Sequence, residues 1–246
     1  MQNPERYGND WHDVYDEYVG HTRRDTGAAV EFIAQLPSAA TVLELGLGTG
    51  RLAIPIAKRG IKVEGIEASQ AMIDMFERSD GSEGITVHKL DYSNFSLPAK
   101  YGVVLGAFNA LSMLPTREDQ MECLSCAAKA LEVDGVIVVE NDLPDLSNFV
   151  DNLRMHVIQS ELDKLEIQLV THNRSAQQFV AHHLSFTDSG VARRPVRMRY
   201  LGTSEIDLMA QAAGLRLAHR FADWNRSPFT SAARNHVSVY QHTAQS

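Results

Sequence analysis

Residues 41–51 carry an acidic side chain and three glycines at a fixed spacing. Their sequence is Thr-Val-Leu-Glu-Leu-Gly-Leu-Gly-Thr-Gly-Arg, in which Glu44 precedes Gly46, Gly48 and Gly50. Glycine adopts positive φ angles readily and lets the backbone come close to a ligand. The apolar residues before the glycines predict a strand, and we expect a helix directly after them, whose free N–H groups would face that ligand. This arrangement is typical of a nucleotide-cofactor site.

The spacing of the glycines and the charge of Glu44 restrict the kind of cofactor. The dinucleotide fingerprint G-x-G-x-x-G does not fit, because its last glycine would fall on Arg51 when counted from Gly46, and counting from Gly48 also fails. A carboxylate at position 44 would repel the pyrophosphate of a nicotinamide cofactor. S-adenosylmethionine (SAM) has no phosphate, and its amino group and sulfonium are cationic, so Glu44 would suit it. An NAD(P)-dependent oxidoreductase remains the alternative from a different class.

The segment Val-Leu-Glu-Leu-Gly-Leu-Gly-Thr-Gly at 42–50 resembles the first motif of class I SAM-dependent methyltransferases. The resemblance covers residues 41–141 well and 200–240 moderately. It implies an α/β fold with a seven-stranded, Rossmann-like, doubly wound sheet whose last strand is antiparallel. It also implies SAM as cofactor and a small-molecule methyl acceptor, with the protein acting in secondary metabolism. A non-catalytic SAM-binding regulator is a third hypothesis.

Two further acids follow predicted strands. Glu67 ends the predicted strand 61–67 and lies 19 positions after Gly48, about the spacing at which an acid meets ribose hydroxyls. Asp91 follows the predicted strand 85–90, and the resemblance implies that it accepts a hydrogen bond from the adenine amino group. The carboxyl ends of parallel strands meet at one edge of a sheet, where ligands bind in open α/β folds. We therefore expect the acids to share one site.

The resemblance extends the predicted site to other elements. Phe108 and Asn109 follow the predicted strand 101–106 and would stand between cofactor and acceptor. Tyr15 lies in an N-terminal helical segment that would cover the cofactor, although core packing explains it equally well. Met72 fits either an adenine contact or the core. The residues predicted to contact the cofactor are Glu44, Gly46, Gly48, Gly50, Glu67, Ala68, Met72, Asp91, Tyr92, Phe108 and Tyr15.

The order of the expected elements divides the chain into three parts. Residues 1–36 form the helical cover segment, and residues 37–141 with 200–246 form the SAM-binding core. The alternation of strands and helices stops after the fifth strand, so residues 142–199 are predicted to be an antiparallel β insertion. In the resembled family, an insertion at this point covers the substrate.

Within the insertion, residues 151–164 are polar and resemble a helix. Residues 165–170 and 178–186 alternate between apolar and polar side chains, which predicts two antiparallel strands joined by a hairpin. His182 falls on the apolar face of the second strand, and His183 falls on the other face.

The acceptor side is predicted from the end of the chain. If the last strand, 234–240, is antiparallel to the others, it begins at the cofactor edge, which would bring His236 and the preceding loop with Trp224 and Arg226 near the site. His236 and His182 are the candidate catalytic residues. The candidate substrate-binding residues are Asn109, Arg199, Trp224 and Arg226. Arg199 belongs to a group that is either a solvated strand edge or a contact for an anionic substrate. That group is Arg193, Arg194, Arg197 and Arg199. A free amine needs no strong base, so we expect N-methylation more than O-methylation.

Composition excludes several classes of function. The net charge of −8 disfavours a nucleic-acid substrate, because such proteins need a basic surface. No apolar run approaches the ~18 residues of a membrane span, and the N-terminus has no secretory h-region. The two cysteines, Cys123 and Cys126, indicate a reducing, cytoplasmic setting and fit a buried helix face better than a redox pair or a metal site. We expect no metal and a possible homodimer.

Overall fold

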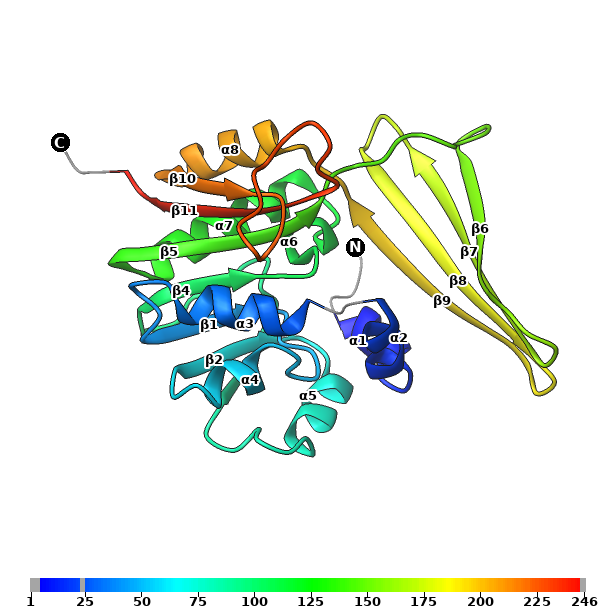
Figure 1. Cartoon of the computed structure of the whole chain (residues 1–246), viewed down its shortest axis with the longest axis horizontal. Coiled ribbons are helices and arrows are strands. Elements are labelled where there is room, and N and C mark those ends of the chain that lie inside the picture. The colour runs from blue at the N-terminus through cyan, green and yellow to red at the C-terminus, as the bar shows by residue number, and fades with distance from the viewer. Residues whose placement is uncertain (1–4, 23–24, 244–246) are drawn as a thin grey trace.

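The computed structural model describes residues 5–22 and 25–243. Three helices precede the first strand: α1 (Glu5–Trp11), α2 (Tyr15–Thr22) and α3 (Thr26–Ala34). Figure 1 shows α1 and α2 between the main body of the protein and a second sheet, whereas α3 lies against the main body.

The main sheet contains seven of the described strands. They are β1 (Thr41–Leu45), β2 (Lys62–Glu67), β3 (Thr86–Lys89), β4 (Tyr101–Gly106), β5 (Leu131–Asp142), β10 (Leu215–Phe221) and β11 (Asn235–His242). Their spatial order is β10-β11-β5-β4-β1-β2-β3. All pairs that exclude β11 are parallel, and β11 is antiparallel to both of its neighbours. The predicted sheet is confirmed, and the strand predicted over 101–106 matches β4 residue for residue.

The central strands are apolar on both faces because helices cover both sides of the sheet. Leu43 and Val104 pack on one side with α7 (Arg117–Ala130) and α8 (Thr203–Ala212). Val42, Val103 and Leu105 pack on the other side with α3 and α4 (Ala53–Ala57). A strand buried on both faces is expected to be almost continuously hydrophobic, and every residue of β4 is buried.

The helices that connect these strands begin at the expected signals. They are α4 (Ala53–Ala57), α5 (Gln70–Glu77), α6 (Ala110–Met113), α7 (Arg117–Ala130) and α8 (Thr203–Ala212). Pro55 lies in the first turn of α4, where its missing N–H costs no hydrogen bond. The Ser69 hydroxyl caps α5 by accepting from the N–H of Met72, and Thr116 caps α7 in the same way. None of the described helices has both the length and the apolar composition needed to cross a bilayer.

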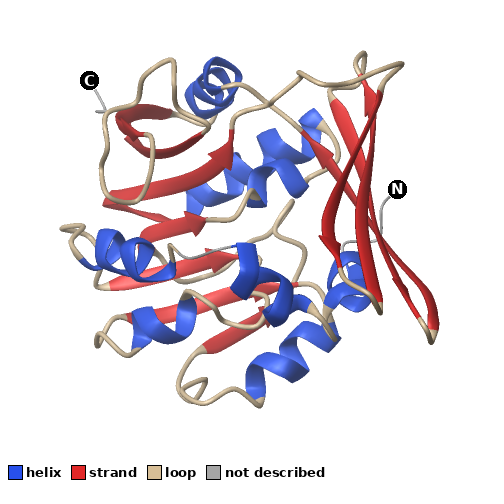
Figure 2. Ribbon diagram, turned by 45° about the vertical axis from the view of Figure 1, so that its right-hand side comes forward, coloured by secondary structure: helices blue, strands red, loops and turns tan. Residues whose placement is uncertain are grey.

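The insertion forms a separate antiparallel sheet beside the N-terminal helices (Figures 1 and 2). Its strands, in spatial order, are β6 (Leu153–Ser160), β7 (Lys164–Asn173), β8 (Gln178–Thr187) and β9 (Gly190–Arg199). The two strands predicted here are confirmed. The helix predicted over 151–164 is wrong, because this segment is β6, paired with β7 along its length. Its polar composition concealed the strand, and pairing with a distant segment overrides local propensity.

Candidate functional site

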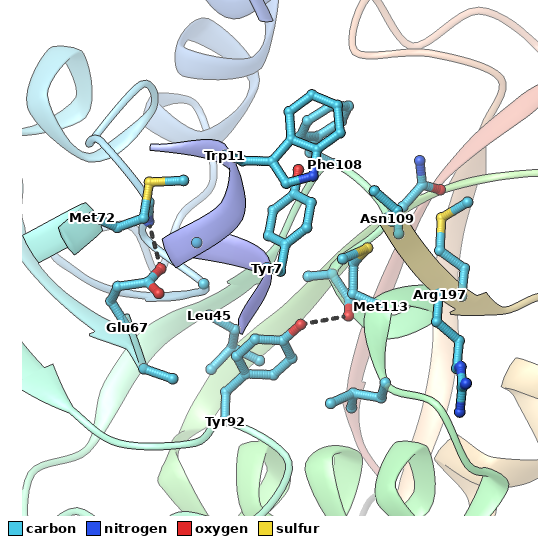
Figure 3. Close-up of a pocket in the computed structure, with 18 of the residues that line it drawn as sticks. Tyr7, Trp11, Leu45, Glu67, Met72, Tyr92, Phe108, Asn109, Met113 and Arg197 are labelled. Carbon is cyan, nitrogen blue, oxygen red and sulfur yellow. Dashed lines mark hydrogen bonds between the residues drawn. The ribbon is translucent and has the colours of Figure 1, made fainter. Parts of the chain in front are cut away.

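A cavity of about 680 Å³ lies where the carboxyl edge of the main sheet meets α1, α2 and the insertion. Figure 3 shows its centre, with side chains converging from α1, from the ends of the main-sheet strands and from the loop after β4. This is the size range of ligand pockets for small molecules. The cavity therefore has one wall built by the main sheet and one built by the helices and the insertion.

The glycine turn after β1 lies against two aromatic rings. Gly46 and Gly48 have φ angles of 73° and 59°. A Cβ on Gly46 would lie 3.3 Å from the Tyr92 ring, and one on Gly48 would lie 3.7 Å from the Tyr15 ring. Gly50 differs, because it does not line the cavity, and a Cβ there would lie 2.6 Å from Phe76. Gly50 is therefore explained by packing in this structure, and a cofactor contact at Gly50 stays a prediction.

Glu44 presents a buried carboxyl group to this cavity. It is 6% exposed, and its Oε2 atom has no hydrogen-bond partner among the described residues. Burial raises the pKa of Glu44 to about 8, against the opposing effect of the Arg51 charge. A buried acceptor without a donor is costly. A cationic donor such as the SAM amino group would satisfy it, so this position fits that cofactor.

Glu67 is fixed at the end of β2 by main-chain donors. Its Oε2 accepts from the N–H of Gly48 at 2.9 Å, and its Oε1 accepts from the N–H of Ser69 at 2.9 Å. Burial raises the pKa of Glu67, and these main-chain bonds oppose the rise. A carboxylate has about four acceptor sites, so two bonds leave capacity for hydroxyl donors. Ala68 follows it in the cavity wall.

The loop after β3 supplies the next part of this wall. Asp91 lines the cavity and accepts from the N–H of Ser93 through Oδ1 at 2.8 Å. The Tyr92 hydroxyl donates to the carbonyl of Ala110 at 3.0 Å (Figure 3). Met72 also lines the cavity and belongs to the same hydrophobic cluster as Trp11. Its position is therefore compatible both with an adenine contact and with core packing.

The backbone after β4 is held in an unusual conformation. Phe108 and Asn109 have φ angles of 53° and 62°, which non-glycine residues rarely adopt. The Phe108 N–H donates to a Glu140 carboxylate oxygen at 2.6 Å. The Asn109 amide donates to Asp142 Oδ2 at 2.7 Å, while the N–H of Asp142 donates to Asn109 Oδ1 at 2.7 Å. Strain of this kind persists only when surrounding bonds enforce it, and it is concentrated at functional sites.

Three side-chain bonds attach the N-terminal helices over the cavity. Thr49 donates to Asp16 at 2.6 Å, Ser69 donates to Asn9 at 2.8 Å, and Arg194 of β9 pairs with Asp13 at 2.9 Å. The helices contribute four aromatic residues to the cavity wall. These are Tyr7, Trp11, Tyr15 and Tyr18.

The inner face of the insertion completes the second wall. His183 of β8 lines the cavity opposite Gln168 of β7, with Gln168 Nε2 and His183 Nε2 3.0 Å apart. The His183 ring meets the rings of Trp11 and Tyr18 edge-on, at centroid distances of 4.8 and 5.4 Å. Burial lowers the pKa of His183 to about 4, so the ring is neutral at pH 7. Sequence reasoning missed this residue. The alternation in β8 had separated it from His182, but no sequence signal showed which face the cavity occupies.

Neither histidine predicted to be catalytic lines the cavity. His182 lies on the outer face of β8, where its Nδ1 accepts from Arg193 at 3.2 Å. His236 is completely buried on β11, with its Nδ1 2.8 Å from the Ser238 hydroxyl. Its side chain shares the sheet face with Tyr240 and lies inside the core. The expectation that these two side chains reach the site is therefore corrected.

Three of the predicted substrate-binding residues also lie outside the cavity lining. Arg199 is buried and pairs with Glu205 at 2.7 Å, which joins the end of β9 to α8. The rings of Trp224 and Phe32 lie 5.4 Å apart, and the Arg226 guanidinium lies over Phe32 at 4.7 Å. The loop before β11 turns toward α3 and away from the acceptor side. Asn109 is the predicted substrate residue that lines the cavity.

The C-x-x-C segment lies on a buried helix face, as expected. Cys123 and Cys126 are both free and buried on α7. Among the described residues, no group of three or more metal-binding side chains is close enough to hold an ion.

Comparison with known proteins adds independent findings. A family model described as a methyltransferase domain matches residues 42–135. The structure of the CcbJ methyltransferase from Streptomyces caelestis is similar over 99% of this chain and 100% of that chain, with a TM-score of 0.92 and 33% identity. The cypemycin N-terminal methyltransferase of a Streptomyces species is 22% identical over 202 residues, 82% of each protein. The dTDP-3-amino-3,4,6-trideoxy-alpha-D-glucopyranose N,N-dimethyltransferase of Streptomyces venezuelae is 30% identical over 139 residues, 54% of this chain and 58% of that protein.

Proposed function

The chain belongs to the class I SAM-dependent methyltransferases, and from this premise we propose that it methylates a nitrogen atom of a small-molecule amine in a biosynthetic pathway. SAM supplies a methyl group that its sulfonium centre activates toward nucleophiles. The protein's contribution is then to hold the cofactor, orient the acceptor and exclude water. Alignment of two reactants supplies roughly 7–11 kcal/mol of barrier lowering in well-oriented systems.

The main-sheet wall is the cofactor side in this proposal. Glu44 holds the cationic amino group, Glu67 accepts from the ribose hydroxyls, and Asp91 accepts from the adenine amino group. The support is that all three carboxyl groups line one cavity at the ends of adjacent strands. Phe108 and Asn109 separate this side from the acceptor side.

The acceptor wall carries the argument for nitrogen. Asp119 and Asp142 line the cavity together with Trp11 and Tyr18, and Arg197 also lines it, so acidic side chains outnumber this basic one on the acceptor side. Carboxylates and aromatic faces favour a positively charged ligand, which suits an amine that arrives as an ammonium ion. The ammonium ion loses its proton to solvent before the methyl transfer, and the free amine then needs no strong base, whereas an alcohol does. The pKa of about 4 makes His183 a weak base, so it suits orientation of the acceptor.

The relatives support the same choice. One is named as the cypemycin N-terminal methyltransferase, and another as the N,N-dimethyltransferase of a dTDP-linked amino sugar. From these names we take only the chemical class of the acceptor, an amine on a small or compact molecule. The oxidoreductase alternative has no support from the comparisons.

The three parts of the chain take separate roles in this proposal. Residues 37–141 and 200–246 bind the cofactor, residues 1–36 cover it, and residues 142–199 form the lid over the acceptor. The support is that helices from residues 1–36 and strands from residues 142–199 line the same cavity as the glycine turn.

Incubation with methyl-labelled SAM and a panel of acceptors tests the proposal. The panel contains amino sugars, cyclic secondary amines, amino-acid derivatives, and phenols and alcohols of matched size. We expect labelled product and release of S-adenosylhomocysteine with amines, detected by mass spectrometry. Transfer to hydroxyl acceptors alone would overturn the choice of nitrogen. SAM binding without transfer to any acceptor would favour the regulator.

A further inference from the structure

The outer face of the four-stranded sheet is apolar although it faces solvent. Cross-strand neighbours on this face form successive rows, from the base of the sheet to its tip. The rows are Leu153-Thr171-Val180-Arg197, Met155-Leu169-His182-Pro195, Val157-Ile167-Leu184-Arg193 and Ser160-Leu165-Phe186-Val191. Several of these apolar side chains are strongly exposed, among them Met155 at 64%, Val157 at 55% and Val191 at 64%.

The inner face of the same sheet shows the opposite pattern near its tip. Glu166 and Ser185 are neighbours there, and Lys164 pairs with Glu166 at 3.0 Å. An antiparallel sheet with one solvated face normally places its apolar side chains inward and its polar ones outward. In this sheet the outward side is the apolar one. Among the described elements, none covers the outer face, and both views show it turned away from the rest of the protein (Figures 1 and 2).

Charge on the outer face is confined to one strand. Arg193 and Arg197 both belong to β9, the strand next to the N-terminal helices, and Arg197 also lines the cavity (Figure 3). The rows on β6, β7 and β8 contain only apolar or uncharged polar side chains and His182. Burial and the neighbouring Arg193 both lower the pKa of His182, so it is neutral at pH 7. Two such faces can therefore meet over β6–β8 without bringing like charges together, whereas the arginines would lie at the rim.

The size of the face fits a dimer. Four strands at a spacing of about 4.8 Å, ten residues long at about 3.4 Å per residue, cover roughly 650 Å² in outline. Uncovered apolar patches on monomers seldom exceed about 300–600 Å², whereas a standard interface buries about 800 Å² on each partner. Because side chains project from the sheet, its solvent-accessible area is larger than this flat area.

We propose that two copies of this chain associate through the outer faces of their four-stranded sheets, packed face to face across a twofold axis. The strands β6, β7 and β8 provide the apolar centre, and β9 provides the charged rim. Sheets packed in this way lie about 10 Å apart with interdigitated side chains. The inner faces remain over the two cavities, so the dimer would hold both lids in place.

Light scattering coupled to size-exclusion chromatography of the full chain tests this proposal. The wild type should elute with twice the mass of the 27.3 kDa chain. Leu169→Glu places a charge at the centre of the face on β7, and Met155→Glu places one in the same row on β6, at a position that is already 64% exposed. Both variants should elute as single chains. Leu208→Glu, at a 66% exposed position on α8 outside the face, should remain dimeric.

Several results would overturn the proposal. One is a wild type that elutes as a single chain at micromolar concentration. If such a monomer bound neutral phospholipid vesicles, the face would be a membrane contact instead. If both glutamate variants fold and still elute as dimers, face-to-face packing is excluded and pairing through the β6 edge is favoured. If Leu169→Glu fails to fold by circular dichroism, the mass of Met155→Glu decides.

Discussion

The two walls of the cavity are built in different ways. On the proposed cofactor side, the N–H groups of Gly48 and Ser69 fix the Glu67 carboxylate. On the acceptor side, side chains are held by other side chains, as with Gln168 and His183. Main-chain donors are supplied by the turns at the strand ends whatever side chains stand there, whereas side-chain pairs need particular residues at particular positions. The difference indicates a general cofactor site joined to an individual acceptor site.

The strongest test of this division is Glu67→Ala. The change removes the proposed ribose acceptor and the two bonds that fix the glycine turn. Hydrogen bonds to charged groups contribute about 1.5–3 kcal/mol each, so SAM affinity should fall by roughly 100-fold or more. Isothermal titration calorimetry measures it. Gln168→Ala on the opposite wall is the control and should bind SAM like the wild type. Equal affinities of Glu67→Ala and wild type would place the cofactor elsewhere.

The boundary between the two sides is tested at Asn109. Asn109→Ala removes the paired bonds to Asp142 and leaves an alanine at a positive φ angle. Asn109→Gly removes the same bonds but relieves the backbone strain. We expect both to reduce kcat, and alanine to be less stable than glycine by about 1 kcal/mol in urea unfolding. If the alanine variant is as stable as the glycine variant, backbone strain at position 109 does not contribute measurably to stability.

Adjacent histidines on opposite faces of β8 give a smaller test of the acceptor side. His183→Ala removes a ring from the cavity wall, and the acceptor KM should rise by roughly 10-fold. SAM affinity should stay unchanged. His182→Ala, one residue away on the outer face, should leave both constants unchanged. A higher acceptor KM for His182→Ala than for His183→Ala would reverse the assignment of the faces.

The smallest effect on activity is expected at His236. Burial lowers the pKa of His236 to about 4, below its unfolded value of about 6.5. The neutral ring therefore contributes stability above pH 6.5 that is lost as the pH falls toward 4, at most about 3 kcal/mol. His236→Gln should reduce this acid sensitivity in thermal unfolding, with turnover per folded molecule kept. A large loss of turnover at unchanged stability would restore the catalytic hypothesis.

The parts that could be predicted from sequence are those encoded locally. The glycine turn, Glu67 and Asp91 each follow an apolar strand, and parallel strands bring their ends to one edge whatever the rest of the chain does. The strand over 101–106 was equally clear, because a fully buried strand is continuously apolar.

The acceptor side depends on contacts that local patterns do not encode. Nothing within 151–164 shows that β6 pairs with β7. β11 is antiparallel and begins near His236, as predicted, but the His236 side chain points into the core. Arg199 and Trp224 failed for a related reason, since partners on α8 and α3 hold them away from the cavity. In each case a long-range packing choice decided the result.

The most direct test of the cofactor site follows the proton on Glu44. The pKa of about 8 means that its carboxyl group is protonated near pH 6.5, where the amino group of SAM is charged. Binding of the cation should ionise Glu44 and release up to one proton. Calorimetric titration with SAM, in two buffers of different ionisation enthalpy, should detect this release in the wild type and not in Glu44→Gln. A wild type that releases no proton, or an equal release from both proteins, would contradict the assignment.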